Sequence, residues 1–74
     1  MLDNAVVVLD CLAAAPASLA ELVERTELSR PTAYRLAVAL ETHRYVERDP
    51  DGRFRLGVRL AELAAAAGGD PLVR

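Results

Sequence analysis

The sequence predicts a mainly helical domain that carries one small β-hairpin. Three stretches in the first two thirds of the chain repeat apolar residues at helical spacing, and each has its own start signal. Alternation with a period of two replaces this spacing over residues 45–56, and helical spacing returns over residues 58–67. With 74 residues, the chain forms one small core and leaves little room for a deep pocket.

The first helix is expected over residues 5–14, with Asp3 or Asn4 as its N-cap and Pro16 just beyond its end. Its expected core-facing residues are Val6, Leu9 and Ala13. Cys11 lies among apolar neighbours in this helix. That setting favours a small buried side chain over a redox or nucleophilic group, because no partner base is near it in the sequence.

The second helix begins at a capping box and is expected to end near Arg25. Ser18 can accept a hydrogen bond from the amide of Glu21, whose carboxylate reaches back to the amide of Ser18. The residues that we expect to face the core are Leu19, Leu22 and Val23.

The third helix follows after a tight turn at residues 26–28. Ser29 caps it, Pro31 occupies its first turn, and the helix is expected to end near His43. Its buried stripe is expected to be Ala33, Leu36, Ala37 and Leu40. His43 can either donate to the last carbonyls of the helix or contact a phosphate. A metal-binding role is disfavoured because no other His or Cys has ligand spacing.

Residues 45–48 and 53–56 alternate between apolar and polar side chains, and the turn sequence of residues 49–52 separates them. This pattern predicts a two-stranded hairpin. Phe54 and Leu56 are expected to face the core, so Arg53 and Arg55 are expected to project together from the other face.

A fourth helix is expected to start after Gly57, with apolar positions at Val58, Leu60, Leu63, Ala64 and Ala67. Gly68 and Gly69 end it, and Asp70-Pro71 resembles the start of another helix. We therefore expect a domain over residues 1–67. Residues 68–74 are expected to begin a linker to an effector domain that the chain does not include.

This order of elements is the winged helix-turn-helix, with a three-helix core, a two-stranded wing and a C-terminal linker helix. In this fold the third helix can enter the major groove of DNA with the face opposite its buried stripe. At about 100° per residue, that face carries Pro31, Tyr34, Arg35, Val38 and Thr42. Arg30 and Thr32 flank its N-terminal end. Arginine can pair with guanine, and hydroxyl groups can bind phosphate.

The charge distribution agrees with a DNA-facing surface. The net charge is −2, but residues 29–59 hold seven arginines against four acidic side chains. Positive charge confined to one block favours a polyanionic partner. For several side chains the sequence allows more than one role. Tyr34 can face DNA or pack on the wing. Arg25 and Arg44 can be solvated or reach phosphates. Arg48 can pair with Glu47, Asp49 or another nearby acid.

Four runs carry a resemblance to a known family. They are Leu-Ala-Glu-Leu (19–22), Leu-Ser-Arg-Pro-Thr-Ala-Tyr-Arg-Leu (28–36) with Leu-Glu (40–41), and Val-Glu-Arg-Asp-Pro-Asp-Gly-Arg-Phe-Arg-Leu-Gly (46–57). Together they resemble the N-terminal domain of IclR-family transcriptional regulators over residues 2–67, and in particular actinobacterial regulators of amino-acid biosynthesis.

The resemblance implies a homodimer on a pseudo-palindromic operator and a small-molecule effector bound by a C-terminal domain that this chain lacks. Carried over by position, it implies DNA contacts by Ser29, Arg30, Thr32, Tyr34, Arg35 and Arg53. Combined with the faces deduced above, the predicted DNA-binding residues are Ser29, Arg30, Pro31, Thr32, Tyr34, Arg35, Val38, Arg53 and Arg55.

Other function classes find less support in the sequence. It has no nucleophile–base pair, metal-ligand set or phosphate-binding glycine loop, so we expect no enzyme activity, cofactor or metal. A single cysteine and the lack of a membrane-length apolar run favour a cytoplasmic protein without membrane contact. The alternative function is a winged helix that binds protein, against which the arginines at positions 30 and 35 count.

Overall fold

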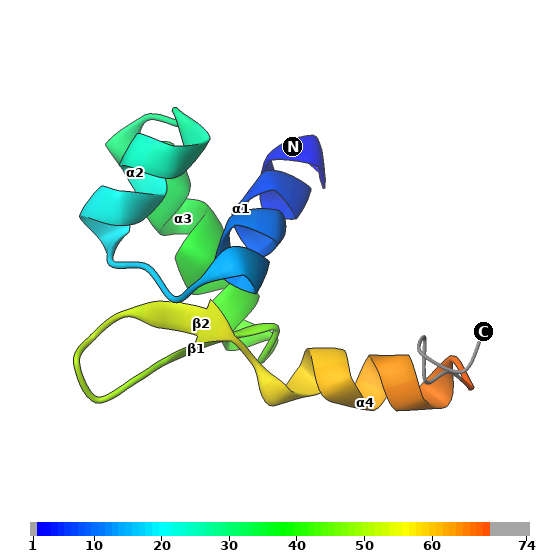
Figure 1. Ribbon diagram of the computed structural model, residues 1–74. Helices are drawn as coiled ribbons and strands as arrows, with labels where there is room; N and C mark the ends of the chain where they lie inside the picture. The colour runs from blue at the N-terminus through cyan, green and yellow to red at the C-terminus, as the bar shows by residue number, and fades with distance from the viewer. Residues whose placement is uncertain (1, 69–74) are drawn as a thin grey trace.

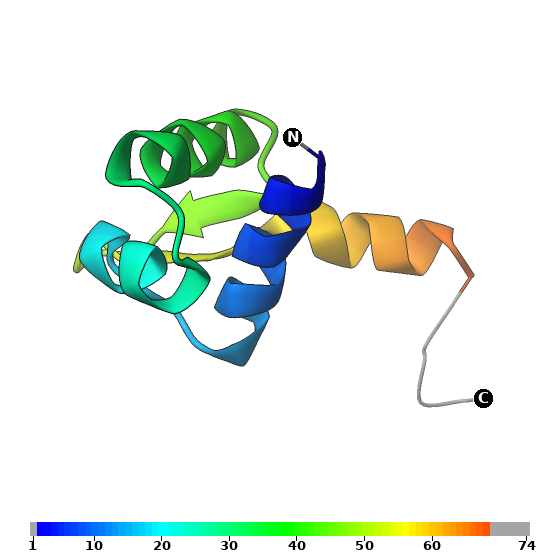
Figure 2. The ribbon, with the colours of Figure 1, turned by 90° about the horizontal axis from the view of Figure 1, so that it is seen from above.

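The computed structural model describes residues 2–68, whose elements are α1 (Leu2–Ala14), α2 (Leu19–Thr26), α3 (Arg30–Thr42), β1 (Val46–Arg48), β2 (Phe54–Leu56) and α4 (Val58–Ala66). The first three helices pack together beside the hairpin, and α4 leads away from them (Figure 1). The view from above shows α4 projecting to one side of the helical core (Figure 2). The predicted winged helix-turn-helix architecture is therefore confirmed.

The hydrophobic core lies between these three helices and the hairpin. Among the described residues, its buried side chains are Val8, Leu12, Ala17, Leu22, Ala33, Ala37, Leu40, Val46 and Phe54. No polar or charged side chain of the described part is buried with them. Apolar burial therefore holds the fold together without a buried ion pair.

Two expectations for α1 are wrong. The helix begins at Leu2, so Asp3 and Asn4 lie within it and cannot serve as its N-cap. Its buried residues are Val8 and Leu12, one turn apart, whereas Val6 is 46% exposed. Val6 and Val8 lie about 160° apart around a helix axis, so both cannot face the same core.

The remaining members of the predicted α1 face also differ from expectation. Ala13 is exposed and Leu9 is only half-buried, although Leu9 still packs against the core. Cys11 is half-buried and packs against the same cluster, in agreement with a small apolar role. A helix this rich in Ala, Val and Leu offers more than one apolar stripe. Only its packing partners select the stripe that is buried.

The predicted caps position α2 and α3. The capping box between Ser18 and Glu21 starts α2, and Leu22 is fully buried beneath it. Glu27 then takes a left-handed conformation (φ 62°), which ends α2 and turns the chain toward the cap of α3 at Ser29. The predicted stripe of α3 is confirmed, with three residues buried and Leu36 half-buried against the core.

The wing is an antiparallel pair in which Val46 lies opposite Leu56 and Arg48 lies opposite Phe54. The loop before α2 joins this sheet. The amide of Ala17 donates to the carbonyl of Phe54 at 2.9 Å, and the amide of Phe54 donates back at 2.8 Å. Phe54 is 3% exposed, whereas Leu56 is 37% exposed although it lies opposite the buried Val46, so Leu56 shares the predicted face but is not covered by the core. The core covers β2 only at the end that pairs with Ala17.

The fourth helix begins after Gly57 as predicted and ends before Gly68, which has a positive φ of 78°. None of its residues is buried, and Val58 and Leu63 are 49% and 38% exposed. Among its predicted apolar positions, Leu60 is half-buried and the other four are exposed. The expectation about Asp70-Pro71 falls outside the described residues.

Candidate nucleic-acid interface

Ser29 and Thr32 build the start of α3. The Ser29 Oγ accepts from the amide of Thr32 at 3.3 Å, and the Ser29 hydroxyl donates to Thr32 Oγ1 at 2.9 Å. Pro31 follows in the first turn, where a missing N–H leaves no helical bond unmade. The two hydroxyl groups thus lie together at the start of α3. The half-buried Thr32 hydroxyl can also donate to a phosphate.

The outward face of α3 is largely accessible. Tyr34 is 49% exposed, which favours an outward ring over one packed on the wing. Arg30, Pro31 and Arg35 are exposed as well, whereas Val38 is half-buried. A solvated helix face with a tyrosine and two arginines is suited to the major groove, where it can bind both phosphates and base edges.

Two arginines of α3 differ from most others in the domain. Within residues 4–68, whose side chains the structure describes, the arginines that form ion pairs are Arg25, Arg48, Arg53, Arg55 and Arg59. Arg30 and Arg35 form none within this part of the chain. A guanidinium without an internal acid keeps its donors and its full charge for an external anion. The outward end of α3 is therefore a positive surface that the protein itself does not neutralise.

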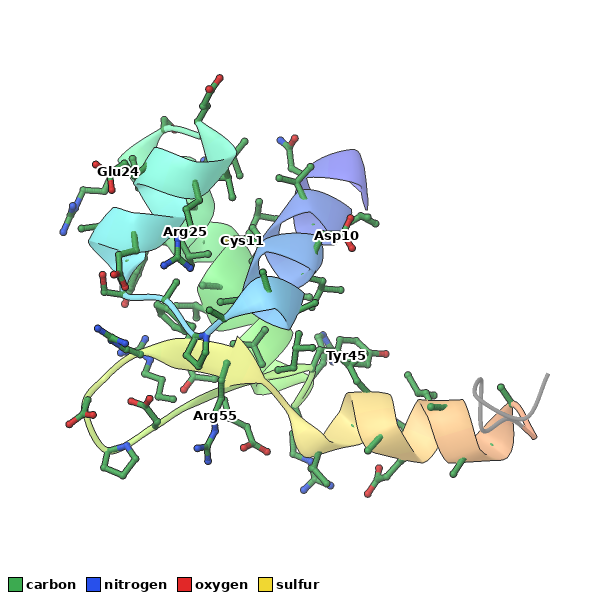
Figure 3. All side chains as sticks on the ribbon, in the orientation of Figure 1. Asp10, Cys11, Glu24, Arg25, Tyr45 and Arg55 are labelled. Carbon is green, nitrogen blue, oxygen red and sulfur yellow. The ribbon has the colours of Figure 1, made fainter. Side chains whose placement is uncertain are left out.

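The two wing arginines are accessible but paired. Arg53 and Arg55 have half-exposed side chains, but they do not project together as expected, because Arg53 reaches toward α2 and Arg55 pairs within the wing. The Arg53 Nε lies 4.0 Å from Glu21 Oε1 of α2. The Arg55 Nη2 lies 3.5 Å from Glu47 Oε1 and points away from the helices (Figure 3). Neither pair was predicted, because each acid is distant from its arginine in the sequence.

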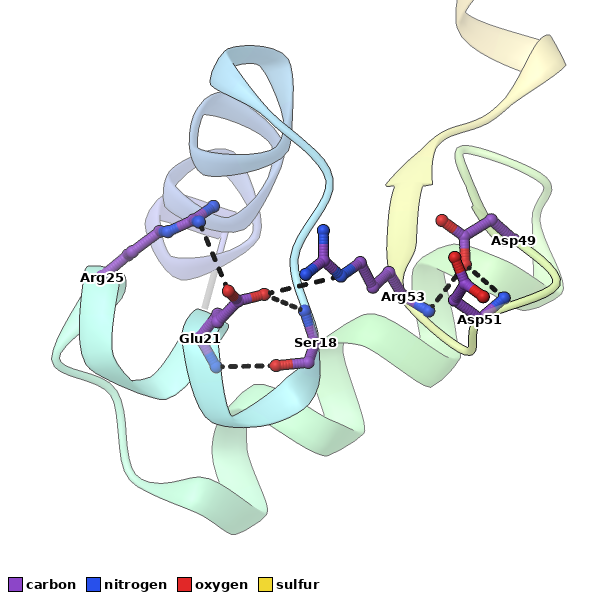
Figure 4. A network of polar contacts seen from close by, with 6 residues as sticks. All are labelled: Ser18, Glu21, Arg25, Asp49, Asp51 and Arg53. Atoms are coloured by element: carbon purple, nitrogen blue, oxygen red, sulfur yellow. Dashed lines mark hydrogen bonds and ion pairs between the residues drawn. The ribbon is translucent and has the colours of Figure 1, made fainter.

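Glu21 sits at the centre of a polar network that links α2 to the wing (Figure 4). Its Oε1 accepts from the amide of Ser18 at 2.8 Å, and its other oxygen lies 3.8 Å from Arg25. The hydrogen bond from the Ser18 amide, followed by the charges of Arg53 and Arg25, lowers the pKa of Glu21. Any external anion that binds Arg53 would therefore compete with the negatively charged carboxylate of Glu21.

The tip of the wing is shaped by Asp49, whose Oδ1 accepts from the amides of Asp51 and Arg53 at 2.9 Å each. Gly52 between them has a φ of 83°, a conformation that side chains other than glycine rarely adopt. This turn places Arg53 immediately before β2. The predicted turn chemistry of residues 49–52 therefore fixes the position of one predicted DNA-binding residue.

Arg44 was not among the predicted site residues. It follows α3 with a positive φ of 66°, is exposed, and forms no ion pair within residues 2–68. A non-glycine residue in this conformation is uncommon, and the sequence around it carries no Gly or Asn that would have marked the turn.

The described residues contain no pocket and no group of three or more side chains suited to hold a metal ion. None of the helices in this part of the chain combines the length and apolar character needed to cross a membrane. A binding site within the described residues would therefore lie on their exposed surface.

Comparison with known proteins agrees with this surface. Residues 1–50 match the family model described as the IclR helix-turn-helix domain. No curated protein matches the chain. Among solved structures, an IclR homolog from Microbacterium sp. strain HM58-2 superposes with a TM-score of 0.80 at 31% identity, over 88% of this chain and 28% of that one.

Two further structures are similar. An IclR-family transcriptional regulator from Rhodococcus sp. has a TM-score of 0.80 at 29% identity, over 90% of this chain and 27% of that one. An IclR homolog from Microbacterium hydrocarbonoxydans, solved with 4-hydroxybenzoate, has a TM-score of 0.77 at 32% identity, over 85% and 27%. This chain thus spans less than a third of the length of these proteins. Because the family model covers more than half of the chain, it belongs to the IclR helix-turn-helix family, the DNA-binding domains of IclR-type transcription regulators.

Proposed function

We propose that this chain is the operator-reading domain of a bacterial IclR-type regulator, with α3 in the major groove. The observation that carries the proposal is the pair of exposed arginines on α3, Arg30 and Arg35, which form no ion pair with the described side chains of residues 4–68. Arginine binds the O6 and N7 atoms of guanine in a bidentate manner, the most common specific contact to a base. An unneutralised arginine pair on the groove-facing side supports sequence reading over mere attraction to DNA.

The other predicted residues divide into three roles. Ser29 and Pro31 shape the start of α3, and the Thr32 hydroxyl donates to a phosphate near the helix N-terminus. Tyr34 donates to the backbone from the exposed face, and Val38 offers an apolar contact to a thymine methyl. On the wing, Arg53 and Arg55 contact the backbone or the minor groove after exchanging their carboxylate partners for phosphates.

The proposal includes a homodimer on a pseudo-palindromic site. Exposed apolar side chains on α1 and α4 support it, namely Val6, Val7, Val58 and Leu63. A dimer presents two copies of α3 to half-sites about one helical turn, or a multiple of it, apart. Sedimentation of the domain should show a mass that rises with concentration. A mass that stays monomeric at every concentration would exclude this assembly for the isolated domain. Residues 68–74 would lead to a separate effector-binding domain.

DNA binding is tested with duplexes enriched by the domain from a pool in which about two helical turns are random. The domain is titrated into an enriched, labelled duplex at two salt concentrations, and fluorescence anisotropy reports binding. We expect affinity to fall steeply with salt and to survive scrambled competitor DNA. Arg35→Ala and Arg30→Ala should each weaken binding about tenfold or more.

Arg59→Ala is the matched control, because Arg59 lies on α4 and pairs with Glu62 at 3.2 Å. It should retain most of the affinity. Equal losses in all three variants would indicate a generic basic surface. If no duplex is enriched and Arg35→Ala behaves like the parent, the DNA proposal fails and the alternative, a protein-binding winged helix, is favoured.

A further inference from the structure

The start of α4 is held by backbone carbonyls of the turn between α3 and β1. The amide of Gly57 donates to the carbonyl of Tyr45 at 2.8 Å, and the amide of Arg59 donates to the carbonyl of Arg44 at 3.2 Å. Because α4 buries no side chain within the described residues, its direction depends on these few contacts at its first turn.

Gly57 is the N-cap residue of α4 and provides no side-chain cap. The side chain of Glu47 in β1 caps the helix instead, since its Oε2 accepts a hydrogen bond from the amide of Val58 at 3.1 Å. A carboxylate at a helix N-terminus is favoured both by the unpaired amide and by the helix dipole. Glu47 thus serves as the cap of a helix that begins eleven residues later.

The second oxygen of the same carboxylate faces the wing. Glu47 Oε1 lies 3.5 Å from the Arg55 Nη2, and Arg55 is opposite Glu47 in the hairpin register of residues 46–48 and 54–56. One carboxylate therefore contacts both a predicted DNA-binding arginine and the first turn of α4. Neither contact is shielded from solvent, because the Glu47 side chain is 37% exposed.

We infer that Glu47 is a positioning residue that couples phosphate binding by Arg55 to the anchoring of α4. This inference rests on the proposed function of Arg55. A phosphate that binds Arg55 draws the guanidinium away from Glu47. The carboxylate then keeps its full charge for the N-terminus of α4 and holds the Val58 amide more firmly. In the free domain, Glu47 conversely restrains Arg55 and weakens its interaction with DNA.

The affinity arm of the test uses Glu47→Gln, which keeps an acceptor for the Val58 amide but removes the charge that restrains Arg55. We expect it to raise DNA affinity about two- to fivefold, the range expected for an exposed ion pair. The slope of log affinity against log salt should change by less than one phosphate contact, because Arg55 binds phosphate in both proteins. In an Arg55→Gln background the same change should have little effect, because the restrained group is gone.

The second arm follows the Val58 amide by NMR in the isotope-labelled domain, through its exchange with water. Addition of the enriched duplex should slow this exchange in the parent and leave it unchanged in Glu47→Gln. Arg55→Gln should slow it without any DNA. Glu62→Gln is the control for net charge, because it removes one acid from an exposed pair on α4. It should alter neither the affinity nor the Val58 amide.

These arms separate the inference from the proposed function. If DNA binds, but Glu47→Gln raises affinity equally with and without Arg55, or Val58 does not respond to DNA, the coupling is refuted while DNA binding stands. If no DNA binds, the proposed function fails, and the comparison of Arg55→Gln with the parent still decides whether Arg55 and Val58 communicate through Glu47.

Discussion

The guanidinium carbon of Arg48 lies 4.7 Å from the centroid of the Phe54 ring, and its Nε lies 3.4 Å from Glu41 Oε1. A cation over an aromatic face is attracted by the ring quadrupole, and the arginine stem covers the ring from solvent. Glu41 belongs to α3 and Phe54 to β2, so Arg48 links α3 to the wing. The sequence left open which acid pairs with Arg48, and the structure identifies Glu41.

Arg48→Ala should therefore lower the free energy of unfolding by about 1 kcal/mol, because it removes the contact with the ring and the cover over it. Glu41→Gln should lower it by less than about 0.5 kcal/mol, since it removes only an exposed ion pair. Urea denaturation of the two variants measures the difference. Equal losses would mean that the ion pair, and not the ring contact, provides the stabilisation.

Leu22 is fully buried, whereas Leu63 is 38% exposed on α4. Leu22→Ala should lower the free energy of unfolding by about 2–5 kcal/mol, because it leaves a cavity between α2 and its neighbours. In a domain of this size that loss leaves much of the protein unfolded. Leu63→Ala should be close to neutral in the monomer. Thermal unfolding followed by circular dichroism tests both, and a stable Leu22→Ala variant would contradict this account of the core.

The pH dependence of stability should contain a contribution from Glu21. Its pKa is lowered in the folded state, so its charged form stabilises the fold above the ordinary glutamate pKa of about 4.3. This stabilisation is lost as pH falls through the lowered value. Glu21→Gln keeps the reciprocal hydrogen bond of the capping box but removes the charge. The unfolding free energy of the parent should exceed that of Glu21→Gln at neutral pH, and the difference should shrink below pH ~4. A constant difference would exclude a role for the charge.

Position 57 requires glycine because a side chain would not fit there, and not because of its backbone angles. A Cβ at this position would collide with the carbonyl oxygen of Arg44 and would lie 3.0 Å from the carbonyl carbon of Tyr45. These are backbone atoms at the α3–β1 turn and cannot rotate away. Gly57→Ala should thus lower the free energy of unfolding by about 1–3 kcal/mol.

Gly52→Asn provides the matched control for Gly57→Ala. Gly52 has open space around its Cβ position, and asparagine tolerates its positive φ of 83°. This variant should remain close to the parent in urea denaturation. If Gly57→Ala were equally mild, the junction between α3 and α4 would have to be more adaptable than the close packing implies.

Local features of the sequence were enough to predict the elements. Caps at Ser18 and Ser29, the first-turn Pro31 and the turn at residues 49–52 each depend on residues within a few positions of one another. The outward face of α3 followed for the same reason, because helical periodicity fixes it once the buried stripe is known. Whether its residues contact DNA stays a prediction, as does the finer resemblance to regulators of amino-acid biosynthesis.

Features set by tertiary packing were not predictable in this way. The buried stripe of α1 depends on where α2, α3 and β2 contact it, and several rotations of that apolar helix were compatible with the sequence. The acids that pair with Arg53 and Arg55 come from α2 and from the opposite strand. Ion pairs between residues far apart in the chain produce no periodic pattern in the sequence. Sequence analysis therefore identified the wing arginines without their partners.

The bridge between Ala17 and Phe54 has a consequence for the order of folding. Its two backbone hydrogen bonds close the segment that contains both α2 and α3, whereas the caps and the hairpin register connect near neighbours. Closing a long segment lowers the entropy of the chain before stabilising contacts have formed. This step is therefore expected to limit the folding rate. The helices can form and dissolve rapidly beforehand. The wing becomes a stable support for α3 only when the loop before α2 has joined it.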